Sequence, residues 1–207
     1  MKRVITAVDV PGGGELRIPT GSIVTAAARE TAAARGVRIV ELPEDQLSAI
    51  APADGTIAIG SDHGGFRLKE ALKPILEGFG LQVRDVGVTE EKPADYPDIA
   101  LKVAELVAER TAARGVIIDG AGIGSSIAAN KVPGVRAALC YDKASARNSR
   151  EHNDSNVLTL GARLLTESQA EDVLRTWLGT PFAGGRHQAR VQKILDIEQK
   201  YSKKGTS

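Results

Sequence analysis

The stretch IDGAGIGSSIAANK, Ile118–Lys131, decides the fold class because it joins a strand-like run to a helix-like run through a glycine-rich turn. The run GVII at residues 115–118 is β-branched and bounded by glycine, which predicts a buried strand. The residues from Ser125 onward are typical of a helix start, with Ser125 or Ser126 as the N-cap. We therefore expect the three glycines of the stretch to lie in a strand-to-helix turn.

A turn of this kind is suited to binding an anion. Its glycines let the backbone adopt positive φ and let a ligand approach the chain, while free N–H groups at the helix start attract negative charge. The sequence therefore predicts a phosphate or an oxyanion as the ligand. The alternative is that the glycines only allow tight packing of a strand against a helix.

The chain from Thr56 onward alternates strand-like and helix-like segments. TIAIG, LQVRDVG, GVIID, VRAALC and NVLTLG have the character of strands, and amphipathic segments follow each of them. One of these helical segments, RLKEALKPILEGFG, contains Pro74, where we expect a kink or a break. The alternation predicts an α/β fold in which helices cover both faces of a parallel sheet, with the ligand beyond the carboxyl ends of the strands.

Residues 1–54 form a separate small segment in this interpretation. Thr25 is a suitable N-cap for an alanine-rich helix, Gly36 a suitable stop, and Val37–Leu42 alternates as a strand does. The segment has the size of one β-α-β unit, and we expect it to pack on a partner or on the main domain because so short a chain buries little core. Residues 43–55 are polar, contain two prolines and are typical of a linker, so the main domain is expected at residues 55–207.

Composition excludes several classes of function. The 27 lysine and arginine residues balance 26 aspartate and glutamate residues, so neither nucleic acid nor a membrane surface is an expected partner. No apolar run approaches the roughly 20 residues that span a bilayer, and the N-terminal residues lack a signal-peptide core, so a cytoplasmic location is expected. The single cysteine, Cys140, excludes an internal disulfide and a multi-cysteine metal site, and we expect it to be buried in a strand.

Polar residues gather next to the predicted strands. Residues 61–65, SDHGG, follow one strand, and residues 119–122, DGAG, follow another. His152, Asn153 and Asp154 precede the strand NVLTLG, and the remaining histidine, His187, lies in GGRHQAR. Each histidine could instead be a structural residue that caps a loop.

These clusters, in this order, resemble the type B ribose-5-phosphate isomerases and the related galactose-6-phosphate isomerase subunits. The matching stretches are IGSDHGGFRLKE, DYPDIA, GAGIGSSIAANKVPGVRAALC, SREHNDSNVLTLGARLL and WLGTPFAGGRHQARV, spread from about Ile57 to about Tyr201. The resemblance implies a Rossmann-like three-layer sandwich with a five-stranded parallel sheet. It also implies a homodimer or a dimer of dimers whose active sites are completed by the neighbouring subunit, and an aldose–ketose isomerase that needs no metal or cofactor.

The resemblance also implies roles for individual residues. Arg186 and Arg190 match the family's phosphate arginines, Arg163 matches a further phosphate contact, and His63 lies near the same end. Arg186 and Arg190 also stand four residues apart, on one face of a helix, which suits bidentate binding of a phosphate dianion. His152 matches the residue that opens the sugar ring.

Further substrate contacts are implied in the same way. Asn153 and Asp62 match residues that bind substrate hydroxyl groups. The backbone of the glycine-rich turn would stabilise the oxygen of an enediolate intermediate; this turn consists of Gly120, Ala121, Gly122, Ile123 and Gly124.

Three positions of this turn depart from the family. The family's proton-transfer base is either a cysteine at the position of Asp119 or a glutamate at the position of Ser125, and a hydroxyl-bearing residue stands at the position of Ala121. One hypothesis is that the Asp119 carboxylate replaces the thiolate as the catalytic base. The other is that Asp119 hydrogen-bonds the N–H groups of its own turn, which weakens it as a base.

The functional prediction is thus a metal-independent sugar-phosphate isomerase, with ribose 5-phosphate and ribulose 5-phosphate as the expected pair. The alternative is a non-catalytic protein that binds sugar phosphates or serves as a scaffold. A dinucleotide site is disfavoured because the third glycine comes one residue too early for G-x-G-x-x-G. The N-terminal segment resembles a short module of bacterial microcompartment enzymes, which implies a location in a microcompartment and contacts with its shell or core proteins; the alternative is an accessory unit for oligomerisation.

Overall fold

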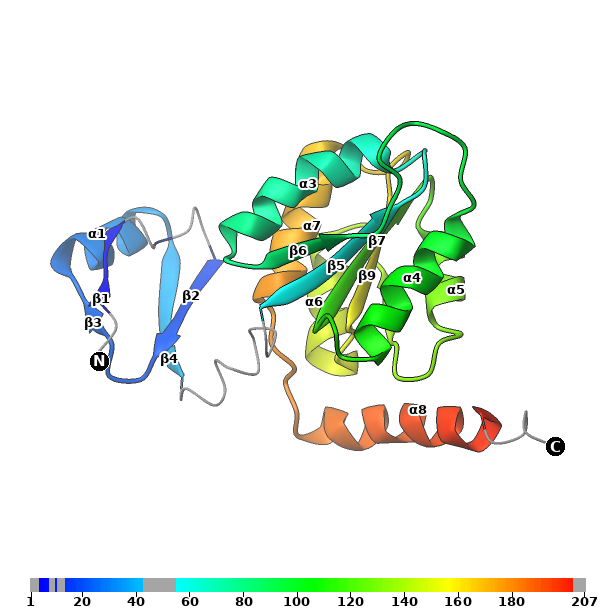
Figure 1. Cartoon of the computed structure of the whole chain (residues 1–207). Helices are drawn as coiled ribbons and strands as arrows, with labels where there is room; N and C mark the ends of the chain where they lie inside the picture. Colours follow the sequence, from blue (N-terminus) through cyan, green and yellow to red (C-terminus); the bar gives the residue numbers. More distant parts are fainter. Residues whose placement is uncertain (1–3, 8–9, 11–13, 43–54, 203–207) are drawn as a thin grey trace. The chain divides into compact units, whose positions relative to one another are not determined.

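A computed structural model describes residues 4–7, 10, 14–42 and 55–202 of the 207-residue chain (Figure 1). The chain divides into two compact units, Met1–Ala51 and Pro52–Ser207. The predicted linker at residues 43–55 falls almost entirely outside the described residues.

Among its described residues, the first unit contains two pairs of parallel strands and one helix. Strand β1 (Val4–Ile5) pairs with β3 (Ile23–Val24), and β2 (Gly14–Pro19) pairs with β4 (Val37–Leu42). Helix α1 (Ala26–Ala34) begins as the sequence predicts, because the Thr25 hydroxyl accepts a hydrogen bond from the Ala28 N–H at 3.3 Å. A small core of its own holds this unit together; it consists of Ile5, Val10, Ile18, Ala28, Ala32 and Val37.

The second unit is built on a five-stranded sheet in which every pair of neighbouring strands is parallel. The strands lie in the order β6-β5-β7-β9-β8. Their bounds are β5 Thr56–Ser61, β6 Gln82–Asp85, β7 Arg114–Asp119, β8 Ala137–Leu139 and β9 Val157–Gly161. The predicted α/β class and the five-stranded parallel sheet are therefore confirmed.

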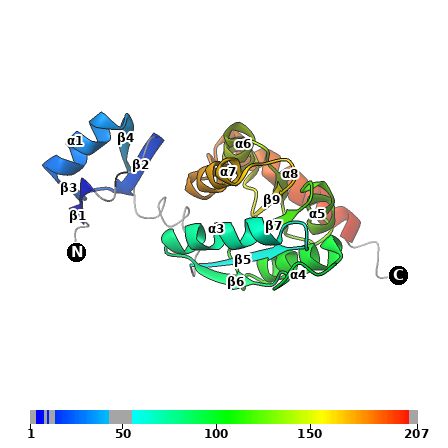
Figure 2. The same cartoon turned by 90° about the horizontal axis from the view of Figure 1, so that it is seen from above.

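Helices cover both faces of this sheet (Figure 2). Helices α3, α6 and α7 pack on one face against Ile57, Val116 and Leu158, whereas α4 and α5 pack on the other against Ala58 and Ile117. Helix α8 stands apart from these layers, and only two of its side chains are buried (Figure 1). The helix bounds are α3 Phe66–Gly78, α4 Tyr96–Ala108, α5 Ile123–Ala129, α6 Lys143–Asn153, α7 Glu167–Gly179 and α8 Arg186–Ser202.

Two helices differ from the sequence prediction. Helix α3 has no break at Pro74, because it continues to Gly78, and a kink there stays a prediction. Helix α5 begins at Ile123, two residues before the predicted start, and its N-cap is Gly122 with φ of 77° rather than a serine. A left-handed residue is required there, and glycine adopts that conformation without steric cost. None of the described helices combines the length and the apolar character needed to cross a membrane.

Candidate active site

The strand order creates a crevice between β5 and β7. The chain passes from β5 to β6 on one side and then to β7 on the other, so the loops that follow β5 and β7 diverge at this point. Ligands of open α/β sheets bind at such a switch point, beyond the carboxyl ends of the strands. The loop after β5 packs closely against the end of β7, because a Cβ on Gly65 would clash with the carbonyl oxygen of Ile118. Asp62 and Asp119 stand at the two sides of this crevice.

The carboxylate of Asp119 is occupied by its own loop. Its Oδ1 accepts hydrogen bonds from the N–H of Ala121 at 2.7 Å and from the N–H of Gly122. Its Oδ2 accepts from the N–H of Ser125 at 3.0 Å and from the Ser125 hydroxyl at 2.5 Å. A carboxylate offers about four acceptor positions, and these four donors fill them. Asp119 is also only 4% exposed.

This geometry favours the second of the two roles considered for Asp119. A base needs a free lone pair that faces the substrate, whereas each oxygen of Asp119 already accepts two hydrogen bonds from within the loop. The carboxylate instead caps the first turn of α5, which explains why no serine is needed as the N-cap. The hydrogen bonds therefore support a role of Asp119 in organising the loop, and its role as the catalytic base stays a prediction.

The same hydrogen bonds affect the predicted contact with an enediolate oxygen. The amides of Ala121 and Gly122 are committed to Asp119 and are not available to a substrate. For Gly120, Ile123 and Gly124, a contact of the backbone with the enediolate oxygen stays a prediction.

Three other predicted residues lie at this carboxyl edge. Asp62 is 8% exposed, and its Oδ1 accepts a hydrogen bond from the Gly65 N–H at 3.0 Å. His63 is exposed, accepts a long hydrogen bond of 3.4 Å from the Ala94 N–H at Nδ1, and lines a cavity of about 340 Å³. The Arg163 side chain runs beside Gly120, with its Nε 3.6 Å from the position that a Cβ of Gly120 would take.

Two tyrosines at this edge were missed by the sequence analysis. The Tyr141 hydroxyl donates a hydrogen bond to the Ala121 carbonyl oxygen at 3.1 Å. The Tyr96 ring fills the space beside Gly124, where any larger residue would collide with it. Tyr141 lies two residues after the carboxyl end of a strand. This position in the sequence was a signal from which its place near the site could have been predicted.

His152 and Asn153 lie at the opposite edge of the sheet. They end helix α6, which leaves the carboxyl end of β8 and runs back to the start of β9. Arg136, directly before β8, donates from Nε to the carbonyl oxygens of Asn153 at 3.3 Å and Asp154 at 2.9 Å. Residues Ala137 and Val157, at the starts of β8 and β9, are paired in register. This end of α6 is therefore at the amino edge.

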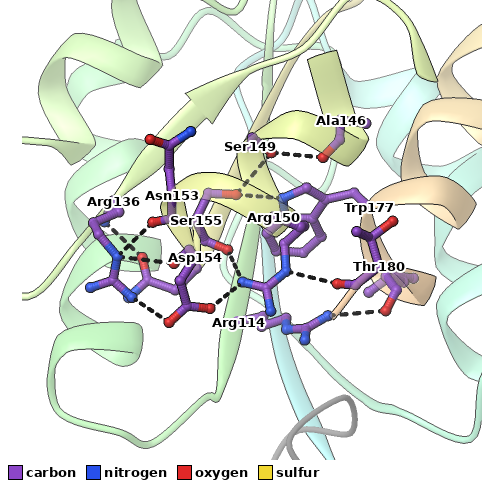
Figure 3. A network of polar contacts seen from close by, with 12 residues as sticks. Arg114, Arg136, Ala146, Ser149, Arg150, Asn153, Asp154, Ser155, Trp177 and Thr180 are labelled. Carbon is purple, nitrogen blue, oxygen red and sulfur yellow. Dashed lines mark hydrogen bonds and ion pairs between the residues drawn. The ribbon is translucent and has the colours of Figure 1, made fainter. Parts of the chain in front are cut away.

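A buried network fixes this end of α6 (Figure 3). Arg150 donates to the Asp154 carboxylate at 2.8 Å, to the Ser155 carbonyl oxygen at 2.5 Å and to the Thr180 carbonyl oxygen at 3.3 Å. The Trp177 indole N–H donates to the Ser155 hydroxyl at 2.8 Å. Burial lowers the pKa of Arg150, which is only 3% exposed. The hydrogen bonds of Arg150 offset the cost of burying its charge, and they hold the backbone that follows Asn153 in one conformation.

His187 joins the start of α8 to this end of α6. Its ring stacks on the His152 ring with centroids 4.2 Å apart and planes 5° apart. Burial first and the neighbouring His152 second lower the pKa of His187. The N–H of Ala183 also donates to the Glu151 carbonyl oxygen at 3.0 Å, which ties the segment before α8 to α6. Arg186 and Arg190, on the first two turns of α8, therefore belong to the amino edge together with His152.

The predicted site residues thus form two groups in one chain. The carboxyl-edge group contains Asp62, His63, the 119–124 loop and Arg163, and the amino-edge group contains His152, Asn153, Arg186 and Arg190. The length of β7 separates the two edges, and six residues of a strand span ~20 Å. A pentose phosphate is far shorter than this separation. One chain therefore does not bring the two groups together around one substrate.

No group of three or more histidine, cysteine, aspartate or glutamate side chains within the described residues is arranged to hold a metal ion. Cys140 is fully buried, as predicted, but it follows the last residue of β8 instead of lying in the strand. Burial raises the pKa of its thiol.

A parallel α/β sheet with acidic and glycine-rich loops at its switch point, and with paired arginines on the last helix, defines an enzyme that acts on small phosphorylated compounds. A family model described as Ribose/Galactose Isomerase matches residues 57–194. The chain belongs to this family and is a sugar-phosphate isomerase.

Three relatives illustrate the similarity. Ribose-5-phosphate isomerase B of Escherichia coli is 44% identical over 144 residues, which cover 70% of this chain and 97% of that protein. D-erythrulose-4-phosphate isomerase of Pectobacterium atrosepticum is 39% identical over 141 residues, covering 67% of this chain and 92% of that protein. The solved structure of ribose-5-phosphate isomerase B of Clostridium thermocellum is 51% identical with a TM-score of 0.69, covering 70% of this chain and 99% of that one.

Proposed function

We propose that the protein interconverts ribose 5-phosphate and ribulose 5-phosphate through an enediolate, at an active site made by two copies of the chain. In this proposal the carboxyl edge of one copy faces the amino edge of the other. The observation that carries it is the separation of the two groups of site residues by the length of the sheet. An isologous dimer brings unlike patches of two identical chains together twice and would form two equivalent sites.

The residues divide the chemistry between the two edges. Arg186 and Arg190 of one copy bind the phosphate dianion in bidentate fashion, together with Arg163 of the other copy. His152 opens the sugar ring by moving a proton between the ring oxygen and the anomeric hydroxyl. Asn153 binds a hydroxyl group of the opened chain. These roles follow from the match to the family. They are supported by the position of His152, Asn153 and the two arginines at one edge of the sheet.

The choice of a pentose rests on the relatives. The relative from Escherichia coli is named for ribose 5-phosphate and is 44% identical, whereas the one from Pectobacterium atrosepticum is named for a four-carbon ketose phosphate and is 39% identical. A site that hydrogen-bonds a substrate hydroxyl group can reject an analogue that lacks it by about 10⁴–10⁵-fold. Assays over four-, five- and six-carbon aldose phosphates therefore decide the substrate, with the highest kcat/KM expected for ribose 5-phosphate.

His152→Asn separates ring opening from proton transfer. Ribulose 5-phosphate is acyclic, because its O5 carries the phosphate and cannot close a ring onto C2. We expect the variant to lose about 10²–10³-fold in turnover of cyclic ribose 5-phosphate, while exchange of the C1 proton of ribulose 5-phosphate with deuterium oxide is retained. Nuclear magnetic resonance measures both rates.

The neighbouring variant Glu151→Gln is the matched control for His152→Asn, and we expect it to keep both rates. Loss of exchange in His152→Asn would contradict a role limited to ring opening. If the wild-type protein neither turns over an aldose phosphate nor exchanges this proton, the proposed function itself fails.

The N-terminal unit is a further part of the proposal. Its separate small core supports an accessory role, either in oligomerisation or in attachment to the shell or core proteins of a bacterial microcompartment. The second possibility rests on the sequence resemblance of this segment and stays a prediction.

A further inference from the structure

The proposed reaction needs a base at the carboxyl edge, and the residues at the family's two base positions are hydrogen-bonded to one another and to their own loop. The acceptor positions of Asp119 are filled by its loop. Ser125 is fully buried, and its hydroxyl donates to Asp119.

Two other acidic groups of the described residues at this edge are engaged elsewhere. Glu91 forms an ion pair with Arg67 beside the 340 Å³ cavity. Asp142 caps helix α6, because its carboxylate accepts a hydrogen bond from the Ser145 N–H at 2.7 Å. Glu167 lies in the first turn of α7, at the rim of the same cavity.

Asp62 differs from these groups in both position and occupancy. It follows the last residue of β5 and so stands at the switch point, across the crevice from the 119–124 loop. The Gly65 N–H uses one acceptor position on Oδ1, and no described residue donates a hydrogen bond to Oδ2.

The space around Gly64 places Asp62 next to the glycine-rich turn. A Cβ on Gly64 would lie 3.4 Å from Asp62 Oδ1 and 3.8 Å from the Gly120 amide nitrogen. The Asp62 carboxylate and the start of the turn therefore both lie close to Gly64, and the Arg163 side chain lies beside Gly120.

We propose that Asp62 is the catalytic base that carries the proton between C1 and C2, a role that rests on the proposed function. The Asp62 carboxylate removes the C2 proton of the open-chain aldose, the C2–H electron pair forms the C1–C2 double bond, and the carbonyl electrons move to O1. The negative charge of the resulting enediolate lies on O1. Protonated Asp62 then returns the proton to C1 while the O2 proton passes to O1, which gives the ketose with all atoms conserved.

The test is Asp62→Asn, assayed by exchange of the C1 proton of ribulose 5-phosphate with deuterium oxide. Because this ketose is acyclic, the assay reports proton transfer without ring opening. We expect exchange and turnover to fall together by about 10³-fold, with KM changed by less than about threefold. Exchange at the wild-type rate in Asp62→Asn would overturn the proposal and leave Asp62 as a hydroxyl contact.

Two further variants keep the test decisive. Asp142→Asn is the matched control, since asparagine caps a helix as well as aspartate does, and we expect wild-type exchange. Asp62→Ala leaves a small gap that formate can fill. Added formate is expected to raise the exchange rate of this variant at least tenfold, and a merely structural role of Asp62 would not give this increase. A folded Asp62→Ala variant without rescue, combined with exchange retained in Asp62→Asn, contradicts the role of Asp62. Absence of exchange in the wild-type protein would instead refute the proposed function.

Discussion

Replacing Asp119 with alanine is expected to lower the free energy of unfolding of the second unit by about 3–5 kcal/mol, because buried donors lose their acceptor. The backbone N–H groups of Ala121, Gly122 and Ser125 and the Ser125 hydroxyl all point at this one carboxylate. Water cannot fully replace it, since Asp119 is 4% exposed and Ser125 is fully buried. The loop would have to rearrange to satisfy these donors.

Urea unfolding followed by tryptophan fluorescence measures the effect of Asp119→Ala. Trp177 is the only tryptophan of the chain and is fully buried in the second unit, so its emission reports on that unit. Asp142→Ala is the matched control. Its exposed carboxylate caps α6, and its removal should cost about 1 kcal/mol. Equal stability of the two variants, with proton exchange lost only in Asp119→Ala, would contradict the structural role and restore Asp119 as a base.

The layers of the second unit could be predicted from the sequence because each strand is a short apolar run between glycines or polar residues. Strand β7 and the turn after it illustrate this: GVII is fully buried, and Gly120 and Gly122 lie in the strand-to-helix turn, whereas Gly124 already belongs to α5. The start of α5 could not be predicted. Serine is the usual N-cap, and the sequence does not reveal that the Asp119 carboxylate, four residues upstream of Ile123, caps the helix instead.

The role of Asp119 was left open by the sequence for a related reason. Residue types show that a carboxylate stands beside glycines, but only the geometry shows how many donors reach it. The placement of His152 also needed the structure. It depends on the direction of α6 and on long-range contacts such as Arg150 with the Thr180 carbonyl oxygen, which lie 30 residues apart. Sequence proximity to a strand does not tell which edge of the sheet a residue occupies.

Mixing two inactive variants is expected to restore activity if two chains build each site. Asp62→Ala damages the carboxyl-edge group and leaves the amino-edge group intact, whereas His152→Asn does the reverse. In a dimer of one Asp62→Ala chain and one His152→Asn chain, one active site contains both damaged edge groups. The other active site contains an intact carboxyl-edge group and an intact amino-edge group. Random pairing makes half of all dimers mixed, so the mixture should regain about a quarter of the wild-type turnover of ribose 5-phosphate.

The central claim is that residues from opposite edges of two sheets meet around one sugar phosphate, and this mixture tests it most directly. The two variants are co-expressed, or unfolded together and refolded, and turnover is compared with that of each variant treated alone. The account predicts less than about one hundredth of wild-type activity for each variant and about a quarter for the mixture. A mixture no more active than the two variants separately would show that each chain acts alone, and would contradict the account.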